Sequence, residues 1–366
     1  MSLMVRFRQA GTARKIVEAI RRLGVREEVK VCHVCGTHEW TVSHYGLRSL
    51  LPDNVEVIAG PGCPVCIVPA REIDEAVWLS LNEATVVTFG DMFRAPGSSM
   101  SLRDAKAVGG HVQIVYSVRE AVRMAREHPD EEYVFFAIGF ETTAPTTAVE
   151  VVRGLPKNLS FLVSHRLIPP AMEALARMED LAISGFIAPG HVSTIIGAEP
   201  YRVFPEKYGI PVVVAGFEPL DFLMAVYMIL RQVKEGVARL ENEYRRAVRW
   251  EGNVAAKRVM ARAYRVVDGA WRGIGVIPDS ALELREQYSE WDARLRYDIK
   301  VGPGVDVHPG CRCPDIMVGK ARPTDCPLFM KACTPEKPKG PCMVSVEGTC
   351  RIWAAHMPQR VREKTY

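Results

Sequence analysis

Short apolar runs recur between residues 30 and 215 and alternate with segments whose apolar positions have helical spacing. The runs 85–89 and 211–215 are almost continuously apolar, which is typical of parallel strands buried on both faces. Residues 12–23 instead gather Ile and Val on one face opposite Arg and Glu, the pattern of an amphipathic helix. The predicted strands are 30–34, 55–59, 85–89, 111–116, 133–138, 159–163, 185–189 and 211–215.

This alternation predicts an α/β fold, because a parallel strand pair needs a crossover connection that is usually helical. The chain has 366 residues and is too long for one ordinary domain. We expect two similar parallel-sheet α/β domains, 30–130 and 131–236, which share the strands evenly. Residues 1–29 and 237–366 are expected to form a helical, cysteine-rich iron–sulfur domain, with further helices throughout 237–298.

Most chemically reactive side chains directly follow a predicted strand. In open parallel sheets the crevice at the carboxyl ends of the strands is the usual ligand site, so these segments should meet in one cleft or in facing clefts. None of them is a phosphate loop of the GxGxxG or GxxxxGK[ST] kind, which argues against a nucleotide-binding enzyme. The segments are 35–39, 60–66, 90–91, 139–143, 164–166, 189–191 and 216–218.

Composition further narrows the range of possible functions. Hydrophobic residues make up 48% and charged residues 25%, as in water-soluble globular proteins, and no apolar run approaches the length of a membrane span. The first residues lack a secretion signal, so we expect a cytoplasmic location. The net charge is only +4, with the basic residues spread along the chain, so a nucleic-acid surface is not indicated. Ten cysteines in such a chain favour metal binding or redox chemistry over structural disulfides.

Cys63 and Cys66 form a CxxC pair between glycines and prolines at the end of a predicted strand. Such a pair closes a disulfide, attacks as a thiolate or shares a metal, and a buried turn with inert thiols is the structural alternative. A four-thiolate zinc site with Cys32 and Cys35 is disfavoured, because the first pair lies partly within a strand. Cys35 is the better reactive thiol, since a helix start favours the thiolate. A Cys–His hydrolase pair with His38 would need an oxyanion site that we do not identify.

Six cysteines after residue 310 lie in a proline-rich segment that can bury little apolar surface. We therefore expect a metal or covalent links to order it. Their irregular spacing fits neither zinc ribbons nor ferredoxins, and a [4Fe–4S] cluster, zinc and disulfides are the alternatives. A [4Fe–4S] cluster needs four thiolates, and Cys311 and Cys313 are so close together that they look least like independent ligands. The favoured cluster ligands are Cys326, Cys333, Cys342 and Cys350.

Further side chains are candidates because they follow strands. His38, His165 and His191 each follow a strand beside Gly, Ser or Pro, whereas a structural histidine is as common elsewhere on a polar helix face. Glu141 follows an apolar run and precedes two threonines, so its alternative role is a charge at a helix N-terminus. His38, Glu141 and His191 join Cys35 and the CxxC pair as candidate catalytic residues.

Four motifs and a cysteine-rich tail follow one another in order: CGTHE at 35–39, GPGCPVC at 60–66, GFETT at 139–143 and PGHVS at 189–193. Over almost the whole chain this set resembles the hydrogenase maturation factor HypD family. The resemblance implies a scaffold that, with the small partner HypC, holds iron while carbon monoxide and two cyanides are added for [NiFe] hydrogenases. By the same resemblance, HypE is expected to supply the cyanide. The resemblance also implies two α/β domains plus a [4Fe–4S] domain, Cys35 as iron ligand, and Cys63 with Cys66 as a redox pair.

We therefore expect a redox-active assembly scaffold for the Fe(CN)2CO centre, working in a HypC–HypD–HypE complex without nucleic acid or membrane. Iron would be held at Cys35, electrons would come from the tail cluster through thiols, and cyanide would enter the cleft between the α/β domains. The main alternative is a free-standing thiol–disulfide oxidoreductase of small substrates. A zinc-stabilised interaction module without redox function is the third hypothesis.

Overall fold

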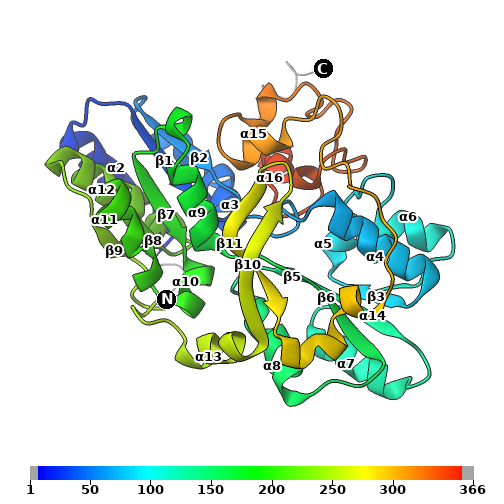
Figure 1. Ribbon diagram of the computed structural model, residues 1–366. Coiled ribbons are helices and arrows are strands. Elements are labelled where there is room, and N and C mark those ends of the chain that lie inside the picture. Colours follow the sequence, from blue (N-terminus) through cyan, green and yellow to red (C-terminus); the bar gives the residue numbers. More distant parts are fainter. Residues whose placement is uncertain (1–6, 357–366) are drawn as a thin grey trace.

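The computed structural model describes residues 7–356 and confirms an α/β fold with two parallel sheets and a cysteine-rich region near the C-terminus (Figure 1). All eight predicted strands are present. The first sheet has the order β2-β1-β7-β8-β9 and the second has the order β4-β3-β5-β6. Strands of the first sheet are β1 (Val29–His33), β2 (Val55–Ala59), β7 (Gly185–Pro189), β8 (Val212–Ala215) and β9 (Leu240–Asn242). Strands of the second sheet are β3 (Thr85–Thr88), β4 (Val112–Ile114), β5 (Tyr133–Gly139) and β6 (Leu159–His165).

The expected division of the strands near residue 130 is wrong, and the sheets do not follow the boundaries 30–130 and 131–236. β1 pairs with β2 and also with β7, which comes from the far half of the chain. The chain therefore crosses from the first sheet to the second after β2 and returns after β6. Regular spacing could not reveal this pairing, because strands adjacent in sequence are neighbours in a sheet only about two-thirds of the time.

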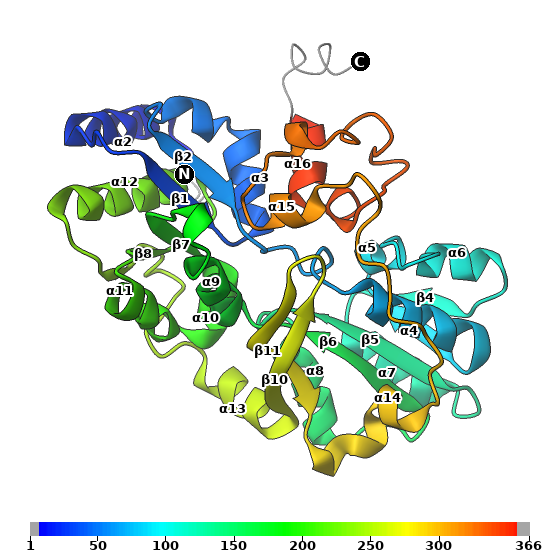
Figure 2. The ribbon, with the colours of Figure 1, turned by 45° about the horizontal axis from the view of Figure 1, so that its top comes forward.

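Helices cover the sheets and build three apolar cores (Figures 1 and 2). One core lies between the first sheet and α2, α3 and α12, and another between the second sheet and α7 and α8. The largest core runs between the sheets and reaches the C-terminal region. Helices before β9 are α2 (Ala10–Leu23), α3 (Gly36–His44), α4 (Ala70–Asn82), α5 (Gly90–Phe93), α6 (Leu102–Ala107), α7 (Val118–Glu127), α8 (Ala144–Arg153), α9 (Ile168–Ala176), α10 (Gly190–Ile196), α11 (Val203–Tyr208) and α12 (Pro219–Glu235).

The prediction of helices throughout 237–298 is wrong in part, because a long antiparallel hairpin occupies its centre. β10 (Tyr264–Trp271) pairs with β11 (Gly275–Leu284), and β11 contacts β6 and α9 between the two sheets (Figure 2). Trp271 is 1% exposed in the largest core. Pro278 within the second strand hides the strand pattern, since proline is rare inside sheets. The helices of this region are α13 (Val254–Ala263) and α14 (Ala293–Arg296).

The tail, residues 311–356, folds over the ends of β2 and α3 at the junction of the two sheets (Figures 1 and 2). Before the tail begins, Asp306 accepts a hydrogen bond from the backbone N–H of Ala70 at 2.8 Å and fixes the chain beside α4. Gly319 then packs directly against Ile58 of β2. The tail contains α15 (Cys313–Met317), α16 (Thr349–His356) and two short 3-10 helices, Pro323–Asp325 and Pro341–Met343.

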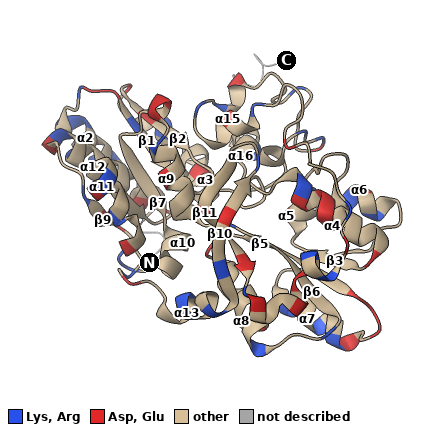
Figure 3. Ribbon diagram, viewed as in Figure 1, with Lys and Arg blue, Asp and Glu red and all other residues tan. Residues whose placement is uncertain are grey.

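Charged side chains of both signs are interspersed over the outer helices (Figure 3). Many form pairs one helical turn apart, such as Arg177 and Glu173 at 2.7 Å. Within residues 7–356, no helix combines the length and the apolar character that a membrane crossing requires.

Candidate functional site

The turn after β2 and the start of α3 lie against each other at one edge of the first sheet. The Gly36 N–H donates a hydrogen bond to the carbonyl oxygen of Gly62 at 3.3 Å. A Cβ on Gly62 would lie 2.3 Å from the backbone nitrogen of Cys35, so only glycine allows this approach. Because β1 and β2 are adjacent parallel strands, their carboxyl ends bring Cys35 beside the CxxC turn, as the sequence predicts.

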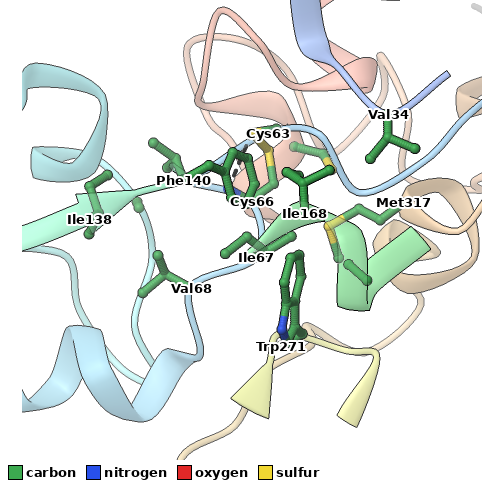
Figure 4. Packing of buried hydrophobic residues seen from close by; sticks show 14 of the residues in the cluster. Val34, Cys63, Cys66, Ile67, Val68, Ile138, Phe140, Ile168, Trp271 and Met317 are labelled. Carbon is green, nitrogen blue, oxygen red and sulfur yellow. Dashed lines mark hydrogen bonds between the residues drawn. A yellow bond between two sulfur atoms is a disulfide. The ribbon is translucent and has the colours of Figure 1, made fainter. Parts of the chain in front are cut away.

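Cys63 and Cys66 are joined by a disulfide, which lies in the largest core beside Phe140 and above Trp271 (Figure 4). Cys66 is fully buried and Cys63 is 6% exposed. In this state the pair is not available for a four-thiolate zinc site. Cys32 is buried in β1, where burial raises the pKa of its thiol well above the ordinary value.

A small cavity brings the sulfur atoms of this turn together with the tail. Cys35, the disulfide and Cys342 line it, together with the carboxylate-bearing Glu347. The tail comes this close because position 36 is glycine: a Cβ on Gly36 would lie 2.5 Å from the Cβ of Glu347. We call this space the Cys35 cavity. Sequence reasoning assigned no role to Glu347, which stands in an irregular segment without a recognisable pattern.

Cys35 favours the neutral thiol. Burial raises the pKa of the thiol to about 11, and the carboxylate of Glu347 adds to the rise. The backbone N–H groups of Thr37 and His38 act in the opposite direction, as expected at a helix start, but burial outweighs them. A metal bound at Cys35 must therefore displace a proton.

The imidazole of His38 faces away from the Cys35 cavity. Its Nε2 lies 2.8 Å from the carbonyl oxygen of Gly216, and its ring packs against Phe217. Burial and the nearby His33 lower the pKa of His38 to about 3, so the ring is neutral near pH 7. His191 stacks on the same Phe217 with ring centroids 3.8 Å apart and is solvent-exposed. Neither imidazole lines the cavity with the thiols.

Glu141 is also outside the cavity, yet it is not remote from it. Its two carboxylate oxygens lie 3.0 and 3.3 Å from the backbone nitrogen of Ile168, which donates to them. Burial raises the pKa of Glu141 to about 7. Burial raises the pKa of the Tyr201 hydroxyl, and the charges of Glu141 and Cys35 add to the rise.

Glu39 is the member of the CGTHE motif for which sequence reasoning proposed no role. Arg48 binds both of its carboxylate oxygens, with Nη1–Oε1 at 3.0 Å and Nη2–Oε2 at 2.7 Å. His33 Nε2 lies 2.9 Å from Oε2, and the indole N–H of Trp353 donates to Oε1 at 2.8 Å. Burial alone would raise the pKa of Glu39, but Arg48 and His33 hold it well below the ordinary value. An acidic residue in the first turn of a helix already has an ordinary explanation, which hides this role.

A second cavity, which we call the sulfur cavity, gathers every cysteine of the tail. The residues that line it besides the thiols are Ile316, Phe329, Gly340 and Met343. The described lining therefore offers only soft sulfur donors in an apolar shell, a donor set that fits an iron–sulfur cluster. No three His, Cys, Asp or Glu side chains within residues 7–356 converge on a point suited to a single metal ion, whereas the thiolates of a cluster bind separate corners. The cysteines are Cys311, Cys313, Cys326, Cys333, Cys342 and Cys350.

The six thiols of the sulfur cavity lie close to one another, because all of them line the same small space. The four predicted ligands are together, but Cys311 and Cys313 line the same space, so short spacing in the sequence does not set them apart. Cys342 lines both cavities and connects them.

A larger groove runs along the outer edge of β2 and is bounded by the tail. It contains no thiol, and its charges are partly paired, for example Arg322 with Glu56 at 3.0 Å. Among the residues that the structure describes, only Ala59 and Thr349 line both this groove and the Cys35 cavity. The two sulfur-lined cavities are therefore the candidate chemical site.

Comparison with known proteins identifies the family. Residues 11–357 match the family model described as "HypD: Hydrogenase formation hypA family". This chain belongs to the HypD family. The hydrogenase maturation factor HypD of Azotobacter vinelandii is 42% identical, with 98% of each chain covered. Factors of the same name from Rhizobium leguminosarum bv. viciae and Cupriavidus necator are 46% and 43% identical, covering 90% and 97% of this chain and 88% and 96% of the relatives. The matched residues of this HypD-family chain include both cavities, and the family places it in hydrogenase maturation.

Proposed function

We propose that this chain is a redox-active scaffold on which the Fe(CN)2CO group of [NiFe] hydrogenases is assembled. The observation that carries the proposal is the Cys35 cavity, where a free thiol, a disulfide and a tail thiol meet. Iron is the cargo of this scaffold. HypC is the proposed partner that shares the iron, and HypE is the proposed source of cyanide.

Cys35 is the proposed iron ligand. Iron that carries cyanide and carbon monoxide suits a soft thiolate donor. The cavity surrounds Cys35 with main-chain contacts on one side and with Glu347 on the other. Burial, together with Asp91, raises the pKa of Glu347, which suits this carboxylate to accept the proton that Cys35 loses when iron binds.

The disulfide is the proposed redox element. Its reduction to two thiols consumes two electrons and two protons, and its oxidation returns them. Cys342 lines both this cavity and the sulfur cavity, so a thiol of the tail stands in the same cavity as the disulfide. A [4Fe–4S] cluster held by Cys326, Cys333, Cys342 and Cys350 would supply single electrons when bound.

Burial distinguishes this proposal from a free-standing thiol–disulfide oxidoreductase. Such an enzyme must present one sulfur to a dissolved dithiol. Here Cys66 is fully buried and Cys63 is 6% exposed, whereas a thiol of the tail lies in the same cavity. The geometry therefore favours exchange within the protein and its partners.

The decisive test replaces Cys35 by Ala and records the infrared spectrum of the anaerobically purified complex with HypC. We expect the CO and CN⁻ bands to disappear while the fold and the visible absorbance of the tail cluster remain. Cys32→Ala is the matched control, because it removes another buried thiol from the same strand end without touching the cavity. Bands of normal intensity in Cys35→Ala would falsify the assignment and move the iron to Cys63 and Cys66.

A further inference from the structure

We propose that Glu39 is a positioning residue that docks α16 of the tail onto α3 and so holds the tail against the Cys35 cavity. The docking itself follows from the contacts of Glu39. The consequence of this docking, that a thiol of the tail stays beside the disulfide for redox exchange, rests on the proposed function.

Trp353 of α16 is held on two sides, by Glu39 and by Arg48. Its indole N–H donates to Oε1 of Glu39 at 2.8 Å, and the guanidinium of Arg48 lies over its ring, with the Cζ atom 5.4 Å from the ring centroid. Arg48 is at the same time bound to both oxygens of Glu39. Hydrogen bonds to ionised groups are stronger than those between neutral groups, and a cation above an indole face adds to them.

The carboxylate of Glu39 is rigid because groups of the first sheet and α3 hold it from behind. His33 of β1 lies 2.9 Å from Oε2, and the hydroxyl of Ser43 donates to Oε1 at 2.7 Å. Glu39 is 1% exposed. Removing its charge would leave Arg48 without its buried ion partner and would weaken the acceptor of the Trp353 N–H, so both contacts of Trp353 with this site depend on this one side chain.

The docked helix links the two cavities. α16 begins at Thr349, which lines the Cys35 cavity, and continues with Cys350, which lines the sulfur cavity. The other helix of this contact, α3, begins directly after Cys35. The α3–α16 contact therefore helps to set where the tail stands relative to Cys35, and Glu39 gives that contact a hydrogen-bonded, charged part.

Hydrogen exchange of the full-length protein tests the docking. Trp353→Phe removes only the indole N–H and keeps a ring beneath Arg48, and Glu39→Gln removes the charge. We expect the amides of α16 to exchange about tenfold faster in each variant, because a hydrogen bond to a charged group is lost. Trp250→Phe, at a half-exposed tryptophan far from the tail contacts, should leave α16 unchanged.

Alkylation of thiols separates docking from general destabilisation. After mild reduction, Cys35 should react several-fold faster in Trp353→Phe, whereas Cys32, buried in the sheet, should keep its rate. The double variant should show less than the product of the two single effects, because both changes break the same bond. Unchanged exchange in α16, or an equal rise in α12 and at Cys32, would overturn the proposal. Neither readout uses CO or CN⁻ bands, so failure of the iron assignment would leave this result intact.

Discussion

The Cys35 cavity and the sulfur cavity share Cys342 but have different walls. The first mixes thiols with Glu39, Glu347 and the main chain of a glycine-rich turn. The second contains only thiols, apolar side chains and one glycine. The carboxylate of Glu347, whose pKa is raised, can take up protons that accompany thiol exchange, whereas an apolar, all-sulfur shell suits a cofactor that stays in place. We therefore propose that thiol exchange takes place in the Cys35 cavity and that the sulfur cavity retains the cofactor.

The largest expected effect comes from breaking the sulfur cavity. Cys350→Ala should abolish the visible absorbance of anaerobically purified protein and lower iron and sulfide from about four each per chain, the content of one [4Fe–4S] cluster. Loss of the cluster should also loosen the tail, because metal binding supplies the energy that orders a segment with little apolar surface. Metal and sulfide analysis measures the first effect, and limited proteolysis measures the second.

Variants in each of the two cavities sharpen this result. Cys63→Ala lies in the other cavity and should retain the absorbance. Parallel replacement of Cys326, Cys333 and Cys342 should reproduce the loss, and Cys311→Ala and Cys313→Ala should retain the cluster if the favoured four are the ligands. Stoichiometric zinc without sulfide in the wild type would contradict the cluster.

Breaking the disulfide should leave the cluster intact and impair maturation instead. Cys66→Ser should keep the absorbance of the tail and lose hydrogenase maturation, because the cavity then lacks its electron-accepting sulfur pair. In the wild type, mass mapping after differential alkylation should find Cys63 and Cys66 protected under mild oxidation and labelled after reduction. Free thiols under oxidation together with normal maturation by Cys66→Ser would remove the redox role.

The sequence was informative wherever a feature depended on local pattern. The strands followed from apolar runs, and the nearness of Cys35 to the CxxC turn followed because β1 and β2 are consecutive strands that pair. The insertion of β7 beside β1 depends on long-range pairing, and in the hairpin β10–β11 Pro278 hides the strand pattern.

Side-chain directions within the site were equally beyond local pattern. His38 is one turn from Cys35 in the sequence, yet the carbonyl oxygen of Gly216 in another strand connection fixes its ring away from the thiol. Glu347 reaches the cavity because the tail packs on Gly36, a contact across most of the chain. Such placements come from tertiary packing, which spacing and composition do not encode.

The smallest expected effect concerns protons, and it comes from Glu141, which lies outside both cavities. Burial raises its pKa from 4.5 to about 7, so the folded protein keeps this carboxyl protonated where the unfolded chain ionises it. Between pH 4.5 and 7 the folded state therefore binds more protons than the unfolded state, and its stability falls as the pH rises. The full shift corresponds to at most about 3 kcal/mol, reached above pH 7.

Glu141→Gln removes this titration while keeping an acceptor for the backbone N–H of Ile168. The unfolding free energy of the wild type minus that of the variant, from urea titrations, should decrease between pH 5 and pH 8 by up to about 3 kcal/mol. Glu127→Gln, at an exposed carboxylate at the end of α7, is the matched control and should show a nearly constant difference. A constant difference for Glu141→Gln as well would mean that Glu141 is ionised throughout this pH range and would contradict the prediction.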